Sequence, residues 1–463
     1  MAAAKTGTDT IAAVSTPPGR GGIGIVRLSG PEATSIAEQL VRLRQPLEPA
    51  RARLADVLDD LDSEVDAGRI DEAVVTFFAA PHSYTAEDLV EIAAHGSPVV
   101  LELLLNRALA LGARLAEPGE FTQRAFLAGR LDLTQAEAVR DLIEAQTLTQ
   151  ARQAAGQMGG ALSRRVQPVK QALVELIALL EAGIDFAEDD VDVTPAAEIA
   201  RRIGAITPPL EALEASFARG RLVHDGLTLA IVGRPNAGKS SLFNCLVERD
   251  RAIVTATPGT TRDTVTERIS LEGIPLELVD TAGLREAAEE VEQLGIARSR
   301  EALADAALVV VVLDATEPLN DEERRLLKTV EGRPAVVAIN KSDLIGGLSE
   351  AGRRLQDCLG LSALATSALT GEGIPALRER ILRLATGGAA AEPGMLTNLR
   401  HKQAIVAALA ALADAAQANA SSIPHEMILL DLYRGLAALD SLTGQTTADD
   451  ILNLIFSTFC IGK

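Results

Sequence analysis

The chain of 463 residues is poor in cysteine and has no long apolar run. Its three cysteines, Cys245, Cys358 and Cys460, form no CxxC pair, and an odd number fits no disulfide framework, which indicates a reducing compartment. The longest apolar runs, such as Ala306–Leu313, are far too short to cross a bilayer and are typical of buried strands. The first ten residues lack the apolar core of a signal peptide. We therefore expect a cytoplasmic protein without a membrane span.

Aromatic side chains and positive charge are also scarce. Aromatic residues make up 2% of the chain, while Ala and Leu are abundant, which favours helices with aliphatic cores. The 44 Lys and Arg are outnumbered by 64 Asp and Glu, giving a formal net charge of −20. Such a chain is not a general nucleic-acid coat, because phosphate neutralisation needs clustered Lys and Arg. An RNA partner would need a local basic patch or a second protein that holds it.

Four zones differ in their hydrophobic pattern. Residues 1–125 mix short strand-like runs with one helical stretch, which predicts a small α+β domain. Residues 126–222 and 387–463 are rich in Ala and Leu at helical spacing, and between them residues 223–386 alternate apolar strands with helices, which predicts a parallel sheet. The chain is therefore predicted to be multidomain, with an α/β domain inserted between two halves of an all-α helical domain.

A phosphate-binding loop opens the inserted zone. Residues Gly233–Ser240 match G-x-x-x-x-G-K-S and lie between a strand-like and a helix-like segment, the context that makes this motif specific. Its glycines let backbone N–H groups face the phosphates, Lys239 is expected to neutralise the β and γ phosphates, and Ser240 to bind Mg²⁺. The alternative is that the match is a chance glycine-rich turn, and the motifs that follow argue against this.

Two further motifs follow in the order that a GTPase requires. Asp280–Gly283 (DTAG) comes after an apolar run, where the carboxylate can hold a metal-bound water and the Gly283 N–H can meet the γ-phosphate. Asn340–Asp343 (NKSD) follows another apolar run, and the Asp343 carboxylate can accept both N–H groups of guanine, which adenine lacks. Ser367 and Ala368 fit the loop that meets the guanine oxygen. The inserted domain is therefore predicted to be a Ras-like P-loop GTPase domain.

The segments expected to contact the γ-phosphate contain one residue typical of a GTPase and lack another. Thr261 is the best candidate for closing over Mg²⁺ and the γ-phosphate. Ras-like GTPases place a water-orienting Gln directly after the DTAG glycine, whereas this chain has Leu284, which cannot orient water. Either hydrolysis is slow or another group does this work. The acidic candidates just downstream are Glu286, Glu289, Glu290 and Glu292.

A second glycine-rich run is interpreted as a decoy. Gly19, Gly21 and Gly24 match the dinucleotide-binding fingerprint in spacing. They follow two prolines and run into the strand-like Ile25–Leu28, where the fingerprint requires a helix. A plain glycine-rich loop is the better interpretation.

Across nearly its full length the chain resembles the MnmE (TrmE) family of tRNA-modification GTPases. The most specific tag is the ending Phe459–Lys463 (FCIGK), for which a GTPase has no general need. The other supporting runs are TPPGRGG from Thr16, SYTAED from Ser83, PGEFTQRAF from Pro118, LDLTQAEA from Leu131, the phosphate loop, GTTRD from Gly259 and DTAGLR from Asp280.

This resemblance implies a domain organisation, a reaction and partners. The domains are an N-terminal domain that binds folate and dimerises, a helical domain, and an inserted GTPase domain. The implied reaction adds an aminomethyl or carboxymethylaminomethyl group to C5 of the wobble uridine 34 of certain tRNAs, with a one-carbon unit from a tetrahydrofolate derivative. The implied partners are a second copy of the chain, tRNA, and a flavin-carrying MnmG-type protein in a heterotetramer, with the FAD on that partner and GTP hydrolysis driving domain rearrangement.

The resemblance also assigns roles to residues. It places K⁺ on Asn236, Thr255, Thr257 and Thr260, and Mg²⁺ on Ser240 and Thr261. Glu292 would position the attacking water, acting with Lys239 and Thr261 in catalysis. Folate contacts would come from Arg27, Glu91, Arg130 and Lys463, and Cys460 is either a packing residue or a reactive, folate-adjacent thiol. The full set expected at GTP comprises Asn236, Ala237, Gly238, Lys239, Ser240, Ser241, Thr255, Ala256, Thr257, Pro258, Gly259, Thr260, Thr261, Asp280, Thr281, Ala282, Gly283, Asn340, Lys341, Ser342, Asp343, Ser367 and Ala368.

A second class of function shares the GTPase core. A regulatory or ribosome-assembly switch would use the same motifs to release an RNA or protein partner. Such GTPases usually append an RNA-binding module with a GxxG loop, and no convincing one follows residue 385. A scaffold that does not hydrolyse GTP is disfavoured by Lys239, Ser240 and Thr261.

Overall fold

The computed structural model describes residues 9–58, 68–185, 194–247, 266–280, 306–345, 363–387 and 394–444, together with Phe459 and Gly462. The chain divides into two compact units, one of residues 1–140 with 439–463 and one of residues 141–438. The domain boundaries that the sequence suggests stay a prediction.

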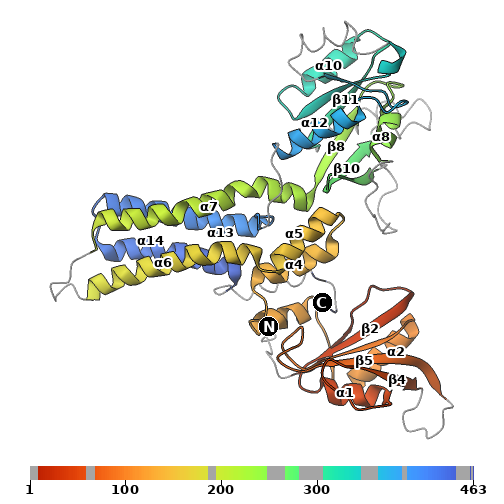
Figure 1. Ribbon diagram of the computed structural model, residues 1–463, viewed down its shortest axis with the longest axis vertical. Helices are drawn as coiled ribbons and strands as arrows, with labels where there is room; N and C mark the ends of the chain where they lie inside the picture. Colours follow the sequence, from red (N-terminus) through yellow and green to blue (C-terminus); the bar gives the residue numbers. More distant parts are fainter. Residues whose placement is uncertain are drawn as a thin grey trace. The chain divides into compact units, whose positions relative to one another are not determined.

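A seven-stranded sheet with helices on one face makes up most of the first unit (Figure 1). Its strand order is β3-β4-β5-β6-β2-β1-β7, and all neighbours are antiparallel except β1 and β7. Residues of α1 and α2 are buried against residues of β2 and β6, as in the contact of Leu104 with the core around Leu28 and Ile92. This is the α+β domain that the sequence predicts. Its elements are β1 (Ile11–Val14), β2 (Gly21–Ser29), α1 (Ala33–Leu40), β3 (Arg42–Leu43), β4 (Ala52–Leu58), β5 (Arg69–Phe78), β6 (Leu89–Gly96), α2 (Pro98–Ala110), β7 (Arg114–Leu115), α3 (Glu120–Leu127) and the start of α4 (Leu133–Glu144).

The glycine-rich run near the N-terminus leads into a strand, as expected. β2 begins at Gly21 and continues through Gly24, so no helix follows the glycines. A Cβ on Gly24 would lie 2.4 Å from Cδ1 of Leu101 on α2. This glycine therefore lets a helix pack closely on the sheet, and the interpretation as a dinucleotide site is excluded.

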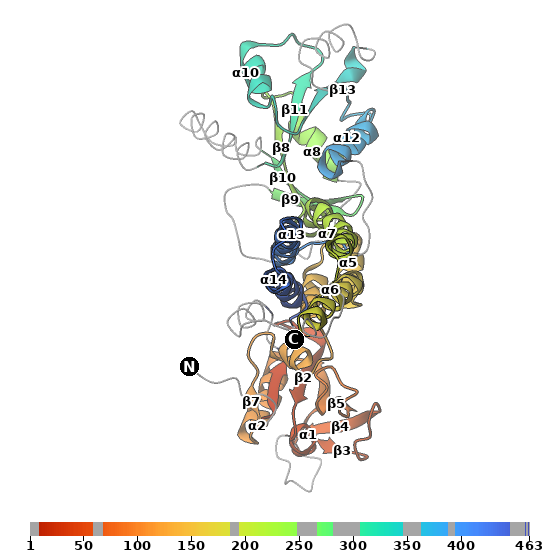
Figure 2. The same ribbon diagram turned by 90° about the vertical axis from the view of Figure 1, so that its left-hand side faces the viewer.

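Long helices form one part of the second unit. Helices α6, α7, α13 and α14 lie side by side in both views (Figures 1 and 2). The apolar residues that recur at helical spacing on α6 are all buried, namely Val169, Leu173, Leu176, Ile177 and Leu180. No helix in the described ranges is both long enough and apolar enough to span a membrane. The helices are α5 (Leu148–Met158), α6 (Ala161–Asp185), α7 (Ala196–Asp225), α13 (Leu399–Ala420) and α14 (His425–Thr443), whose last residues belong to the first unit.

A six-stranded sheet forms the other part of the second unit. Its order is β13-β12-β11-β8-β10-β9, and only β9, at the edge, runs antiparallel to its neighbour. All of β11 is buried, which confirms the buried strand predicted from the apolar run Ala306–Leu313. The elements are β8 (Leu227–Val232), α8 (Lys239–Val247), β9 (Thr266–Leu271), β10 (Ile274–Asp280), β11 (Leu308–Asp314), α10 (Asp321–Thr329), β12 (Ala335–Asn340), the 3₁₀ turn η1 (Ser342–Leu344), β13 (Ala363–Ala365) and α12 (Ile374–Thr386).

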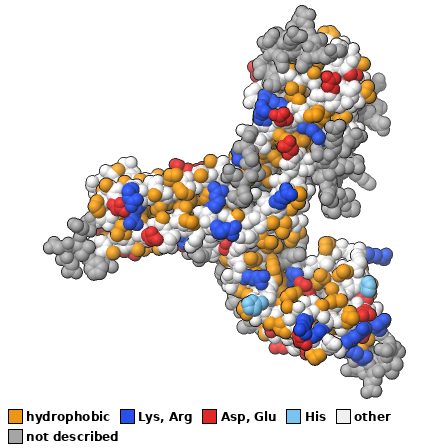
Figure 3. Space-filling model, viewed as in Figure 1, with side chains coloured by type: hydrophobic (Ala, Val, Ile, Leu, Met, Phe, Trp, Pro, Cys, Tyr) orange, Lys and Arg blue, Asp and Glu red, His pale blue; other side chains and the backbone are white. Residues whose placement is uncertain are grey.

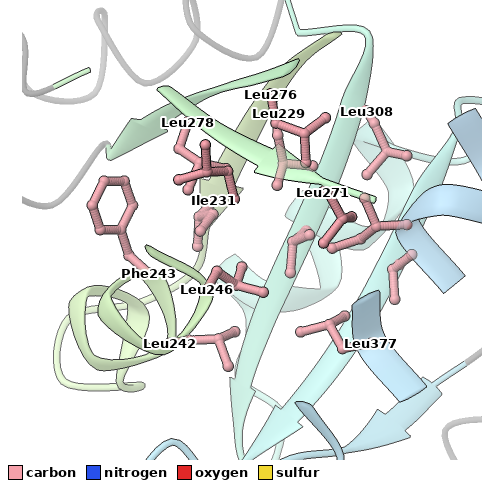
Figure 4. Close-up of a cluster of buried hydrophobic side chains, with 14 of the residues drawn as sticks. Leu229, Ile231, Leu242, Phe243, Leu246, Leu271, Leu276, Leu278, Leu308 and Leu377 are labelled. Carbon is pink, nitrogen blue, oxygen red and sulfur yellow. The ribbon is translucent and has the colours of Figure 1, made fainter. Parts of the chain in front are cut away.

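Helices cover both faces of this sheet. On one face, Leu242 and Leu246 of α8 and Leu377 of α12 pack against Leu229 and Ile231 of β8 (Figure 4). On the other face, buried side chains of α10 meet the alternate residues of β11 and β12. Parallel strands buried on both faces are typical of an α/β domain whose ligand lies beyond the carboxyl ends of the strands.

Candidate functional site

The predicted phosphate loop joins the end of β8 to the start of α8 and depends on two of its glycines. Gly233 and Gly238 have φ angles of 154° and 91°. A Cβ on Gly233 would lie 2.2 Å from the carbonyl oxygen of Val312, and a Cβ on Gly238 would lie 2.1 Å from Nδ2 of Asn340. Only glycine fits both the conformation and the space. The strand–loop–helix arrangement that gives the motif its specificity is therefore present.

The loop places Lys239 and several polar side chains at a helix N-terminus. Lys239 is 8% exposed, and its Nζ donates a 2.7 Å hydrogen bond to the carbonyl oxygen of Arg234. Ser240 and Ser241 lie exposed on the first turn of α8. Asn236, the predicted K⁺ ligand, is exposed on the loop and holds a left-handed φ of 62°. Free N–H groups and the helix dipole make such a terminus attractive to phosphate.

The Asn340 side chain links two loops of the site. Its Nδ2 donates a 3.0 Å hydrogen bond to the carbonyl oxygen of Ala237, and its Oδ1 accepts a 3.0 Å hydrogen bond from the N–H of Ala368. Asn340 is 2% exposed, so both bonds are shielded from water. From the sequence we expected Asn340 at GTP, and in the structure it braces the phosphate loop against the loop predicted to meet guanine.

The next residue, Lys341, forms an ion pair with a carboxylate on the neighbouring strand. Its Nζ lies 2.6 Å from Oδ2 of Asp314, at the end of the neighbouring strand β11. Oδ1 of Asp314 accepts hydrogen bonds from the N–H and the hydroxyl of Thr316, at 2.9 and 2.7 Å. Sequence reasoning missed Asp314, although a carboxylate directly after a fully apolar strand was a visible signal.

The predicted base-reading residues lie close together. Asp343 is on the short turn η1, half-buried, and the backbone N–H of Ser342 donates to the carbonyl oxygen of Thr366 at 3.1 Å. Ser367 is fully buried. The thiol of Cys245 on α8 lies 3.0 Å from the carbonyl oxygen of Ala368, a contact that the sequence did not suggest.

Other predicted residues of this site are described in part or not at all. Asp280 ends β10, and its backbone pairs in register with Ile231 of β8, beside the phosphate loop. The predicted residues outside the described ranges are Thr255, Ala256, Thr257, Pro258, Gly259, Thr260, Thr261, Thr281, Ala282, Gly283 and Glu292, together with Cys460 and Lys463 of the chain ending.

In the first unit the structure brings together three of the segments predicted to contact folate. Arg27 of β2 and Glu91 of β6 are partners in register, and Nη2 of Arg27 lies 2.7 Å from Oε1 of Glu91. Nη1 of Arg27 donates to the carbonyl oxygen of Gly462 at 3.2 Å, and the hydroxyl of Ser15 donates to the same oxygen at 3.0 Å. A Cβ on Gly462 would lie 2.6 Å from the carbonyl oxygen of Val14.

Two aromatic rings lie close to the Arg27 guanidinium. The guanidinium carbon of Arg27 lies 5.7 Å from the ring centre of Tyr84 and 5.5 Å from that of Phe121. Burial raises the pKa of the Tyr84 hydroxyl, while its hydrogen bond with Thr122 and the charges of Arg27 and Arg130 partly oppose this. The exposed Arg130 is therefore close enough to act electrostatically on the same cluster.

A network of ion pairs that the sequence did not reveal supports this region. The side chain of Arg124 on α3 is 8% exposed. It forms ion pairs with Asp9, Glu87 and Glu120 at 2.8, 3.1 and 3.0 Å, respectively. Arg114 also contacts Glu120, at 2.6 Å. Burial by itself would raise the pKa of Glu120, but hydrogen bonds from Arg114, Glu117 and Arg124 outweigh it, so this pKa lies below its usual value. The network ties α3 to the start of β1 and to the loop before β6.

Comparison with known proteins covers almost the whole chain. The family described as "MnmE helical domain" matches residues 133–460, and "GTP-binding protein TrmE N-terminus" matches residues 10–130. A "tRNA modification GTPase MnmE" of Koribacter versatilis is 58% identical over 98% of this chain and 99% of its own length. A protein of the same name from Nitrosomonas europaea is 43% identical over 99% of this chain and all of its own.

Two solved structures each match a part of the chain. The G domain of the T. maritima FeoB iron transporter covers 34% of this chain and 98% of its own, with 30% identity and a TM-score of 0.27. Era from Aquifex aeolicus covers 40% of this chain and 66% of its own length, with 25% identity and a TM-score of 0.29. Scores this low add nothing to the assignment, which the sequence relatives carry. The chain belongs to the MnmE (TrmE) family, whose curated members are named tRNA modification GTPases.

Proposed function

We propose that this protein hydrolyses GTP and that, with a flavin-carrying MnmG-type partner, it modifies C5 of wobble uridine 34 in certain tRNAs. The observation that carries the proposal is the 58% identity to a tRNA modification GTPase across 98% of the chain. The likeness includes both the N-terminal and the helical family segments, which a general GTPase switch does not need. The added group is carboxymethylaminomethyl or aminomethyl.

GTP is proposed to lie beyond the carboxyl ends of β8, β10 and β12. Lys239 and the N-terminus of α8 would hold the phosphates, and Ser240 with Thr261 would bind Mg²⁺. Asp343 would accept two hydrogen bonds from guanine, which gives the site its base specificity. The glycine fit of the loop and the Asn340 brace support this placement, because they hold the phosphate and base loops in one geometry.

Hydrolysis is proposed to depend on K⁺ and on the meeting of two GTPase domains. The chain has Leu284 in place of a water-orienting glutamine, so the transition state needs another source of positive charge and another group to hold the water. K⁺ bound by Asn236 and the threonines at 255, 257 and 260 would supply the charge. Glu292 would hold the water. The exposure of Asn236 supports this, since its side chain is available to a ligand.

The first unit is proposed to bind a tetrahydrofolate derivative beside Arg27 and Glu91. Both hydrogen bonds that Arg27 donates to Glu91 end on Oε1, and Oε2 of Glu91 accepts none from the described residues. That oxygen can accept a hydrogen bond from a pterin N–H edge, while Arg130 and Lys463 can meet the acidic tail of the folate. The partly exposed ring of Tyr84 adds flat apolar surface to the same place, and the Phe121 ring is fully buried next to the same guanidinium.

The tRNA is proposed to be held jointly by this protein and its partner in the cytoplasm. The formal charge of −20 leaves little surface suited to phosphate. On the face seen in Figure 3, Lys and Arg occur in small groups separated by other side chains. The further contacts to phosphate would then come from the partner protein.

Nucleoside analysis of tRNA tests the function directly. Cells lacking the protein should lose the wobble-uridine modification, and the wild-type gene should restore it. A Lys239→Ala variant should fail to restore it, because a neutral residue cannot hold the phosphates, while the matched surface variant Lys328→Ala should succeed. Unchanged wobble uridines in the deletion strain would contradict the proposal and favour a regulatory or ribosome-assembly switch.

A further inference from the structure

The contact between Lys341 and Asp314 has a geometry that bears on base recognition. Lys341 directly precedes the turn that carries Asp343, and its backbone holds a left-handed φ of 63°. Side chains with a Cβ adopt that conformation at a cost, which persists only where surrounding contacts impose it. Here the contacts are the ion pair to Asp314 and a 2.9 Å hydrogen bond from the N–H of Ala315 to the carbonyl oxygen of Asn340.

Asp314 is itself firmly held. Its side chain is 5% exposed, against 33% for Lys341, so the carboxylate is the fixed partner and the lysine is the one that has been drawn in. Burial by itself would raise the pKa of Asp314, but hydrogen bonds from Lys341 and Thr316 outweigh it, and this pKa lies below its usual value. Asp314 is therefore charged at neutral pH and available to the lysine ammonium.

The base-reading carboxylate has an ammonium two residues away along the chain. A lysine side chain is long and rotates freely, and its ammonium seeks a carboxylate wherever one is in reach. If Lys341 paired with Asp343, the ammonium would occupy an oxygen that guanine needs. In the structure the side chain of Asp343 makes no hydrogen bond or ion pair with any of the described residues.

We propose that Asp314 is a specificity-determining positioning residue, which draws the Lys341 ammonium away from Asp343 and so keeps both carboxylate oxygens free for guanine. Thr316 acts with it by fixing the second oxygen of Asp314. The inference rests on the proposed role of Asp343 as the base reader and adds what keeps that reader selective. Asp314 itself has no direct contact with the nucleotide in this scheme.

The experiment compares GTP with inosine triphosphate, whose base lacks the 2-amino group. The ratio of the two dissociation constants measures the second hydrogen bond to Asp343. In the Asp314→Asn variant of the full chain, Lys341 is released toward Asp343, and the preference for GTP should fall about tenfold, the effect of one hydrogen bond to a charged group. Thr316→Val should also lower the preference for GTP, but by less than Asp314→Asn does, since Asp314 keeps its charge.

A second substitution separates this role from a structural one. Lys341→Met should weaken both nucleotides but keep their ratio, and Asp314→Asn combined with Lys341→Met should recover the ratio that Asp314→Asn alone loses. A loss of packing would not be reversed by removing the lysine. Glu331→Gln, an exposed one-charge change in the same domain, is the matched control and should leave the ratio at its wild-type value.

The outcomes distinguish this inference from the function on which it rests. A wild-type protein that binds both nucleotides equally would overturn the role of Asp343, and with it the inference. A wild-type protein that prefers GTP, with the preference kept in Asp314→Asn, would overturn the inference alone. A preference lost in Asp314→Asn and still absent in the double variant would show that Asp314 supports the fold and does not steer the lysine.

Discussion

The Asn340 brace makes a prediction that can be worked out bond by bond. Replacing Asn340 by Ala removes one bond to the carbonyl oxygen of Ala237 and one from the N–H of Ala368, both at 3.0 Å in a residue that is 2% exposed. A buried polar group left without a partner costs about 1–3 kcal/mol, so two of them should lower the local free energy of opening by about 2–6 kcal/mol. Nucleotide affinity should fall as well, because the phosphate loop and the base loop lose their link.

Asn340→Asp has almost the same shape and sharpens the test. Its carboxylate can still accept from Ala368, but the other oxygen now faces the Ala237 carbonyl oxygen across 3.0 Å with no hydrogen between them. Protonation restores a donor, so the pKa of this carboxyl in the folded state should rise above its unfolded value of about 3.9. The folded state then binds more protons than the unfolded state, so the stability of the variant relative to wild type should fall as pH rises from about 4.

Hydrogen exchange followed by mass spectrometry provides the assay. The opening free energies of peptides from β8 and β12 measure the stability of this region alone. A local measurement is needed because a chain of several units does not unfold in a single two-state transition. Both variants should exchange faster there than wild type, and only the Asp variant should show a deficit that grows with pH. Wild-type protection in Asn340→Ala, or a deficit in Asn340→Asp that is the same at pH 4 and pH 8, would refute the reasoning.

Three further predictions concern ligands. GTP turnover should be faster in KCl than in NaCl at equal ionic strength, and Asn236→Ala should abolish the difference while Glu292→Ala slows turnover in both salts; equal wild-type rates would rule out the cation mechanism. Asp343→Asn should weaken GTP and strengthen xanthosine triphosphate in a competition assay, because the amide can donate to the extra oxygen of xanthine; unchanged GTP affinity would show that another residue reads the base. Gly462→Ala should weaken the binding of a reduced folate in calorimetry, because its Cβ would lie 2.6 Å from the Val14 carbonyl oxygen. If the variant bound folate as tightly as wild type, the chain ending would not be part of the site.

Local patterns predicted the fold class and the family, because they encode contacts between neighbours in sequence. Alternating and helical spacing, and a phosphate loop between a strand and a helix, each report on fewer than about twenty residues at a time. The helical zone that contains α6 and the buried strand β11 were therefore visible in advance.

The missed residues depend on contacts between distant segments. Asp314 meets Lys341 only because β11 and β12 are parallel neighbours in register. The Arg124 network joins residues as far apart as Asp9 and Glu120, and no spacing rule connects them. Likewise the Arg27–Glu91 pair was predicted as two separate ligand contacts, whereas the register of β2 and β6 makes the two side chains partners of each other.

The docking of Gly462 beside Arg27 has a consequence for how this protein is made. Arg27 and Gly462 are 435 positions apart in the sequence. The sheet around Arg27 can form early in synthesis, since N-terminal domains generally fold first, at about 5–20 residues per second of translation. The carbonyl that caps its guanidinium arrives only after the helical and nucleotide-binding segments have been translated. The unit that is first to fold is therefore the last to be completed, and any nascent or truncated chain that ends before residue 462 carries this part of it unfinished.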